Sequence, residues 1–91
     1  MAEILRSRVI IPNKRGLHAR ASAKIVEASA RFQSEIEVVK DGTAVNGRSI
    51  MGLMMLAAAK GSKIKFLATG EDAEKMLAEL EALFAKKFEE A

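Results

Sequence analysis

The sequence is poor in the side chains that most often build disulfides, metal sites and stacking surfaces. Its 91 residues include no cysteine, tryptophan or tyrosine, four phenylalanines, and a single histidine, His18. Without cysteine there is no disulfide and no thiolate metal ligand, which fits a reducing compartment. One imidazole with no Cys, Asp or Glu nearby in the sequence lacks the ligands of a metal site, so we expect neither a metal nor another cofactor.

Long apolar runs are missing as well. The longest, residues 50–59, contains ten residues including Gly52, whereas a membrane-spanning helix needs about 20. Charged residues interrupt the apolar ones in the first eight positions, unlike a secretory signal. We therefore expect a cytoplasmic protein without membrane insertion, folded as one domain over residues 1–91.

The overall composition is that of an ordinary globular domain. Hydrophobic residues make up 49% of the chain and charged residues 30%, with a net charge of +3. A mildly basic surface attracts either nucleic acid or acidic proteins. A small nucleic-acid-binding domain is one alternative. It predicts binding that weakens steeply with salt and does not need His18. The scarcity of aromatic residues argues against it.

The spacing of apolar residues predicts seven elements. Alternating apolar and polar residues predict strands at residues 4–11, 34–40, 43–46 and 62–69. Apolar residues three and four apart predict helices at residues 19–31, at residues 50–60, and from residue 73 along an apolar stripe that reaches Phe88. The order is strand–helix–strand–strand–helix–strand–helix. It predicts an α+β two-layer sandwich with helices on one face, although a ferredoxin-like arrangement with an added helix would give the same order.

Polar residues and glycines suggest how these elements begin and end. The pair Asp41-Gly42 predicts a two-residue hairpin, because both residues tolerate a positive φ angle. Ser49 and Asp72 are placed to cap the second and third helices through their side-chain oxygens. Gly61 is placed to end the second helix.

His18 lies where the first strand stops and the first helix starts. The first amides of a helix have no intrahelical acceptor, and the helix dipole is positive there, so an anion is welcome. Arg20 adds a cation that can pair with phosphate oxygens. A nucleophilic ring nitrogen beside such a cradle suits phosphoryl transfer. The alternative is that His18 is merely a surface residue at a helix start and Arg20 is solvated.

Two sequence blocks carry a family resemblance. Residues 16–20, Gly-Leu-His-Ala-Arg, resemble the active-site motif of the histidine-containing phosphocarrier protein (HPr) family of the bacterial phosphoenolpyruvate-dependent phosphotransferase system. Residues 46–53, Asn-Gly-Arg-Ser-Ile-Met-Gly-Leu, resemble the segment around that family's regulatory serine. The resemblance extends over nearly the whole chain. It implies an open-faced sandwich with four antiparallel strands in the order 1-4-2-3, covered on one face by three helices.

The resemblance also implies a function and a site. His18 would accept phosphate on Nδ1 from phosphorylated enzyme I and pass it to an enzyme IIA domain, as a stoichiometric carrier and monomer. Ala19 and Arg20 would hold the phosphate. Two departures are visible: Ala21 replaces the usual proline, and the segment before Gly16 is longer than in common sugar-system members. The second departure leaves the sugar and nitrogen-related branches both open.

The second predicted helix is too apolar to bury only one narrow face. Leu53, Leu56 and Ala57 fit one stripe toward the core. One interpretation is a wide buried face, which methionine fills easily. The interpretation that we favour is an exposed docking patch for partners, made of Ile50, Met51 and Met54 together with Arg20 of the first helix.

Ser49 has two possible roles. As a helix cap its role is purely structural. By resemblance, it is the target of an HPr kinase/phosphorylase, and its phosphate would place negative charge in the docking patch and repel acidic partners. A further alternative is an HPr-like regulator whose phosphorylation state serves only as a signal. The retained His18 argues against a relative that is phosphorylated on serine alone.

Overall fold

A computed structural model describes residues 3–90, so residues 1, 2 and 91 of the predicted domain lie outside the described part. The seven elements occur in the predicted order, followed by a short 3-10 turn. They are β1 (Ile4–Ile10), α1 (Ala19–Ala30), β2 (Glu35–Lys40), β3 (Thr43–Asn46), α2 (Ile50–Met55), β4 (Lys63–Thr69), α3 (Ala73–Ala85) and η1 (Lys87–Glu89).

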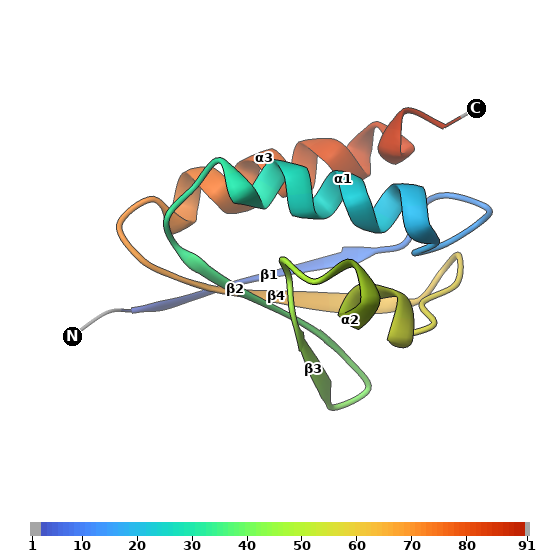
Figure 1. Cartoon of the computed structure of the whole chain (residues 1–91), viewed down its shortest axis with the longest axis horizontal. Coiled ribbons are helices and arrows are strands. Elements are labelled where there is room, and N and C mark those ends of the chain that lie inside the picture. Colours follow the sequence, from blue (N-terminus) through green and yellow to red (C-terminus); the bar gives the residue numbers. More distant parts are fainter. Residues whose placement is uncertain (1–2, 91) are drawn as a thin grey trace.

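The four strands form one antiparallel sheet in the order β1-β4-β2-β3. Strand β4 lies between β1 and β2, so Phe66 pairs with Ser7 on one side and Val38 on the other. Helices α1 and α3 lie side by side over one face, and α2 packs against α1 and β3 (Figure 1). The open-faced α+β sandwich implied by the resemblance is therefore confirmed, and the sheet order that the element pattern left open is decided.

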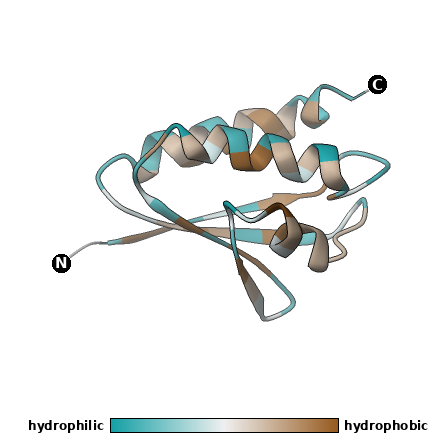
Figure 2. Cartoon of the chain, in the orientation of Figure 1, coloured by the Kyte–Doolittle hydropathy of each residue, from teal (hydrophilic) through white to brown (hydrophobic). Residues whose placement is uncertain are grey.

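The core fills the space between the sheet and the helices. Alternate residues of the strands are buried against helix residues spaced three and four apart. Figure 2 shows hydrophobic stretches alternating with hydrophilic ones along both kinds of element. Phe66 stacks edge-on against Phe84 with ring centroids 5.5 Å apart, and Phe84 in turn meets Phe88 at 4.7 Å. These side chains, together with Ile25 and Leu53, are at most 5% exposed.

The predicted hairpin between β2 and β3 is confirmed. Asp41 and Gly42 have φ angles of 49° and 81°, the pair of positive values that a type I′ turn requires. This turn also fixes the register, in which Lys40 pairs with Thr43.

The prediction for the end of α2 was wrong. The helix stops at Met55 rather than residue 60, and Ala57 has φ 50° and is exposed instead of facing the core. The cause is tertiary: Lys40 Nζ donates to the carbonyl of Leu56, and the next buried residue, Ala58, accepts from the Leu17 amide at 2.9 Å. Gly61 lies in the later turn before β4, where its φ is 88°, so it does not end the helix.

Asp72 precedes α3 but does not cap it with its side chain. Its carboxylate instead accepts from the backbone amides of Gln33 and Ser34, each at 2.9 Å, and from the Ser34 hydroxyl. The hydrogen bond from the Ser34 hydroxyl and the one from the Gln33 amide lower the pKa of Asp72. Three donors from the α1–β2 loop thus outcompete the helix amides.

Candidate functional site

His18 is the N-cap residue of α1, as the sequence predicted for this junction. The loop before it is held by Leu17, whose amide donates to the Ala58 carbonyl, and by Gly16, whose φ is 65°. A Cβ at position 16 would overlap the Ala58 carbonyl oxygen. The sequence therefore needs glycine here to bring the loop, and with it His18, against the α2–β4 connection.

The two ring nitrogens of His18 face different groups. Nδ1 accepts from the Arg20 amide at 3.2 Å, at the start of α1. Nε2 lies 2.6 Å from Oε2 of Glu90, so it carries the proton that this carboxylate accepts. The hydrogen-bond network therefore assigns the Nε2–H tautomer and leaves a lone pair on Nδ1, directed at the positive end of the helix.

Glu90 and Asn13 belong to the site, and sequence reasoning missed both. Asn13 is 3% exposed; its Nδ2 donates to the Gly16 carbonyl at 2.9 Å and to Oε1 of Glu90 at 3.0 Å. The hydrogen bond from Asn13, followed by the one from His18, lowers the pKa of Glu90. Glu90 stands 72 residues after His18, and no local pattern links such distant positions. No Asp or Glu stands near His18 along the sequence, but the fold brings the carboxylate of Glu90 into contact with its ring.

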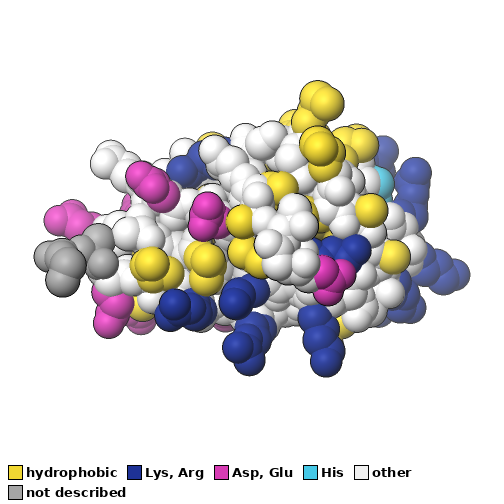
Figure 3. All heavy atoms as spheres, turned by 90° about the horizontal axis from the view of Figure 1, so that it is seen from below, with side chains coloured by type: hydrophobic (Ala, Val, Ile, Leu, Met, Phe, Trp, Pro, Cys, Tyr) yellow, Lys and Arg dark blue, Asp and Glu magenta, His cyan; other side chains and the backbone are white. Residues whose placement is uncertain are grey.

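The predicted phosphate ligands lie beside Nδ1. Ala19 and Arg20 are both exposed in the first turn of α1, where the amides have no intrahelical acceptor. Within residues 3–90, the Arg20 guanidinium forms no hydrogen bond or ion pair. Figure 3 shows the histidine at one end of the molecule beside cationic side chains, with hydrophobic side chains gathered close by. This end can accommodate an anion.

Two basic residues, Arg48 and Lys24, have structural roles. Arg48 Nη2 donates to the carbonyls of Ser29 and Phe32 at 2.7 and 2.8 Å, and so caps the end of α1. Lys24 Nζ donates to the Phe88 carbonyl. Within the second motif, residues 46–53, Arg48 therefore stabilises the fold by binding the end of α1.

The apolar residues of α2 divide as predicted between core and surface. Leu53 is buried, whereas Ile50, Met51 and Met54 are 40%, 73% and 43% exposed. Met55, which the prediction did not include, is 78% exposed and extends the patch. The alternative of a wide buried face is therefore wrong.

Ser49 caps α2, as predicted. Its Oγ accepts from the Gly52 amide at 2.9 Å, and its φ and ψ angles of −113° and 111° are extended, as an N-cap requires. The side chain is only partly buried. The hydroxyl is thus both a structural cap and partly accessible.

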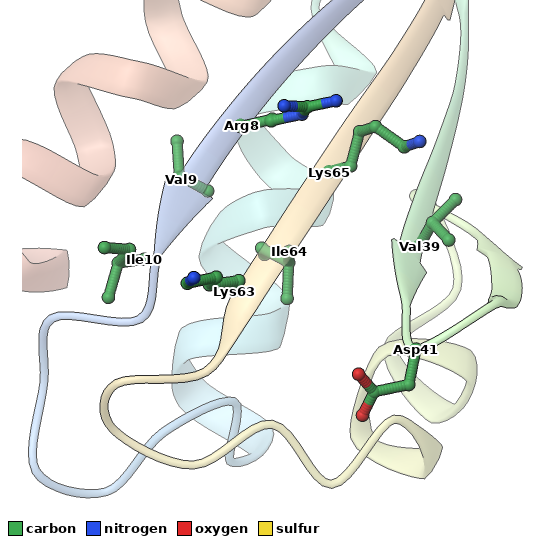
Figure 4. A pocket seen from close by; sticks show the side chains of 8 residues that line it. All are labelled: Arg8, Val9, Ile10, Val39, Asp41, Lys63, Ile64 and Lys65. Atoms are coloured by element: carbon green, nitrogen blue, oxygen red, sulfur yellow. The ribbon is translucent and has the colours of Figure 1, made fainter.

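A separate hollow lies on the uncovered face of the sheet, opposite the helices (Figure 4). It has a volume of about 600 Å³, and the side chains around it include Arg8, Ile10, Val39, Lys63 and Lys65.

Among residues 3–90, no three His, Cys, Asp or Glu side chains gather where they could hold a metal ion. Within the same residues, every helix is too short or too polar to cross a membrane.

The fold and the site define a class: a small open-faced sandwich with one histidine at an anion-attracting helix start. A family model described as the PTS HPr component phosphorylation site matches residues 5–86. The phosphocarrier protein HPr of Xylella fastidiosa strain 9a5c is 42% identical over 87 residues, covering 96% of this chain and 98% of the relative. The chain therefore belongs to the HPr family of phosphocarrier proteins.

Another relative and two solved structures support the same family membership. Phosphocarrier protein NPr of Shewanella violacea is 39% identical, covering 96% of each chain. The crystal structure of HPr-C-His from Thermoanaerobacter tengcongensis has a TM-score of 0.91 at 40% identity, covering 96% of this chain and 98% of that one. A crystal structure of an HPr dimer from the same organism has a TM-score of 0.76 at 43% identity, covering 90% and 94%.

Proposed function

We propose that this chain is a stoichiometric phosphoryl carrier that accepts phosphate on Nδ1 of His18 from phosphorylated enzyme I and passes it to an enzyme IIA domain. One observation carries the proposal: the ring's nitrogens have separate tasks. Nδ1 accepts from the Arg20 amide at 3.2 Å, while Nε2 faces Glu90 at 2.6 Å. Only Nδ1 has both a lone pair and an anion-attracting neighbourhood.

The reaction needs positioning and charge neutralisation rather than a metal ion. The Nδ1 lone pair attacks phosphorus, and the nitrogen–phosphorus bond forms as the bond from phosphorus to the donor's leaving atom breaks. The transferred oxygens then lie against the amides of Ala19 and Arg20 and within reach of the Arg20 guanidinium, which can pair with them bidentately. Transfer to the acceptor is the same step in reverse.

The direct test is to incubate the chain with phosphoenolpyruvate and enzyme I. We expect one acid-labile phosphate by mass spectrometry, with phosphorus and nitrogen NMR placing it on Nδ1. His18→Ala should take up none. An unlabelled wild type, or label that persists in His18→Ala, would refute the carrier function. A chain that instead binds nucleic acid with steep salt dependence, without needing His18, would favour the nucleic-acid alternative.

Partner docking is assigned to the α2 patch of Ile50, Met51 and Met54, together with Arg20 of α1. Exposure of 40–73% on these apolar side chains supports the assignment, since methionine adapts to several partner surfaces. Met51→Ser should raise KM for enzyme I and leave kcat unchanged. Ile4→Ser is the matched control, because Ile4 is also apolar and 48% exposed but lies on β1. Equal effects of both substitutions would contradict docking at α2.

Regulation is assigned to Ser49, the target of an HPr kinase/phosphorylase. A phosphate at a helix N-terminus is compatible with the fold, and it would place negative charge beside Ile50 and repel acidic partners. Ser49→Asp should therefore slow phosphorylation by enzyme I without lowering the melting temperature. Ala78→Asp, which adds the same charge on exposed α3, serves as the control. A normal rate for Ser49→Asp would count against this regulation.

The cellular pathway follows from which acceptors take the phosphate. Both HPr and NPr proteins occur among the relatives. Adding candidate enzyme IIA proteins of the sugar and nitrogen-related branches to the phosphorylated chain separates the two. We expect a cytoplasmic monomer, and light scattering of the phosphorylated and unphosphorylated chain checks the oligomeric state.

A further inference from the structure

The chain makes a tight turn after α3, close to the start of α1. Lys87, Phe88 and Glu89 have φ angles of 53°, 56° and 61°, and such left-handed values are unfavourable for residues other than glycine. The turn is held by Phe88, which is fully buried against Phe84, and by Lys24 Nζ, which donates to the Phe88 carbonyl. A costly backbone conformation is thus stabilised by specific packing.

This turn delivers the carboxylate of Glu90 to His18. One oxygen lies 2.6 Å from His18 Nε2, and the other accepts from Asn13 Nδ2 at 3.0 Å. The Glu90 side chain is 16% exposed and that of His18 18%. Asn13 is itself fixed by the Gly16 carbonyl. Both carboxylate oxygens are therefore occupied, and the imidazole is held in one orientation.

Building on the proposed carrier function, we infer that Glu90 is a positioning residue for phosphoryl transfer at His18. It keeps the ring proton on Nε2, so that Nδ1 presents its lone pair. When Nδ1 bonds to phosphorus and the donor bond breaks, the Nε2 proton stays in place and the ring gains positive charge. The Glu90 carboxylate lies where it neutralises that charge. The hydrogen bond between Nε2 and Glu90 then joins two charged groups, and such a bond is stronger than one between neutral groups.

An amide cannot replace this carboxylate. In Glu90→Gln only one oxygen remains, so the new NH2 group would face either the Nε2 proton of His18 or the Nδ2 donor of Asn13. The negative charge is lost as well. The neighbouring Glu89 offers a matched control, because its side chain is 69% exposed and its only ion pair within residues 3–90 is a 3.9 Å contact with Lys24.

The test compares Glu90→Gln and Glu89→Gln in steady-state phosphorylation by enzyme I. We expect kcat to fall about tenfold for Glu90→Gln, as for loss of one hydrogen bond to a charged group. KM should stay within about twofold, because Glu90 acts through His18 and not through docking. Glu89→Gln should match the wild type. Thermal melting and far-ultraviolet circular dichroism establish that each variant is folded.

Nitrogen NMR of His18 gives a second readout that folding alone does not move. The Nε2–H signal should be protected from solvent exchange in the wild type and in Glu89→Gln, and exchange-broadened in Glu90→Gln. An unchanged kcat for Glu90→Gln, or an effect confined to KM, would overturn the positioning role while leaving the carrier function intact. A wild type that takes no phosphate at all would instead overturn the proposed function.

Discussion

At the scale of the residue, two carboxylates connect parts of the chain that are far apart in sequence. Glu90 binds His18 across 72 positions, and Asp72 binds Ser34 across 38. Each gathers several donors, and donors favour the ionised form, so the pKa of each is lowered. These contacts place His18 at the site and anchor the loop between α1 and β2.

Because the folded-state pKa of Asp72 is lowered, its ionised form stabilises the fold. That stability is fully present above the ordinary value of 3.8 and is lost as the pH falls below it through the folded pKa. We expect Asp72→Asn to unfold more easily in urea near neutral pH, and its free energy of unfolding to depend less on pH in the acid range. Urea titrations from pH 7 to acid check this, and parallel curves for the two proteins would contradict it.

At the scale of the element, the start of α1 depends on the loop that leads into it. Gly16 adopts φ 65° and lies so close to the Ala58 carbonyl that a Cβ would overlap it. The same carbonyl accepts a hydrogen bond from the Leu17 amide. The early end of α2 makes that carbonyl available. Two features that are separate in the sequence, a glycine before His18 and an alanine-rich stretch after α2, are therefore one structural unit.

This unit predicts that Gly16→Ala destabilises the fold by about 2–3 kcal/mol, since it combines an unfavourable φ with loss of the Leu17 hydrogen bond. It should also slow phosphorylation, because His18 would shift. Gly42→Ala is the matched control. Its φ is 81° but nothing lies within 4 Å of the added Cβ, so about 1 kcal/mol is expected with normal phosphorylation. Equal losses in urea unfolding would contradict the role of the Ala58 contact.

At the scale of the whole molecule, the two faces of the sheet carry different groups of side chains. The helix side carries His18, Arg20 and the α2 patch, whereas the uncovered side carries Lys63 and Lys65 around its hollow. Since exposed charges are screened over about 10 Å at ordinary salt, only cations near His18 should assist an acidic partner.

We therefore expect the double substitution Lys14→Glu/Arg15→Glu to slow phosphorylation by enzyme I several-fold at low salt, with the difference shrinking as salt rises. The matched reversal Lys63→Glu/Lys65→Glu changes the net charge equally and should leave the rate near that of the wild type. Stopped-flow or quenched phosphorylation at several salt concentrations measures both. A larger effect from the sheet pair would place docking on the uncovered face.

Much of the fold was predictable because apolar residues recur at every second position in strands and at every third or fourth position in helices. The alternation of apolar and polar residues located all four strands, and the Ser49 cap depended only on neighbours within three residues. The failures were non-local. The end of α2 and the role of Asp72 were decided by donors from other elements, which a local capping pattern cannot reveal.

The sequence by itself determined the elements, the hairpin, and the placement of His18 at a helix start with Arg20 beside it, since these follow from contacts between neighbours along the chain. The pattern of elements left the strand order open, and the order 1-4-2-3 that the family resemblance implied is the one observed. Only the tertiary structure decided the length of α2 and the tautomer of His18. The physical reason is that Asn13 and Glu90 reach the ring through the turn after α3, which depends on Phe88 finding the core. Local patterns identified the histidine, and long-range packing selected which of its ring nitrogens carries the proton.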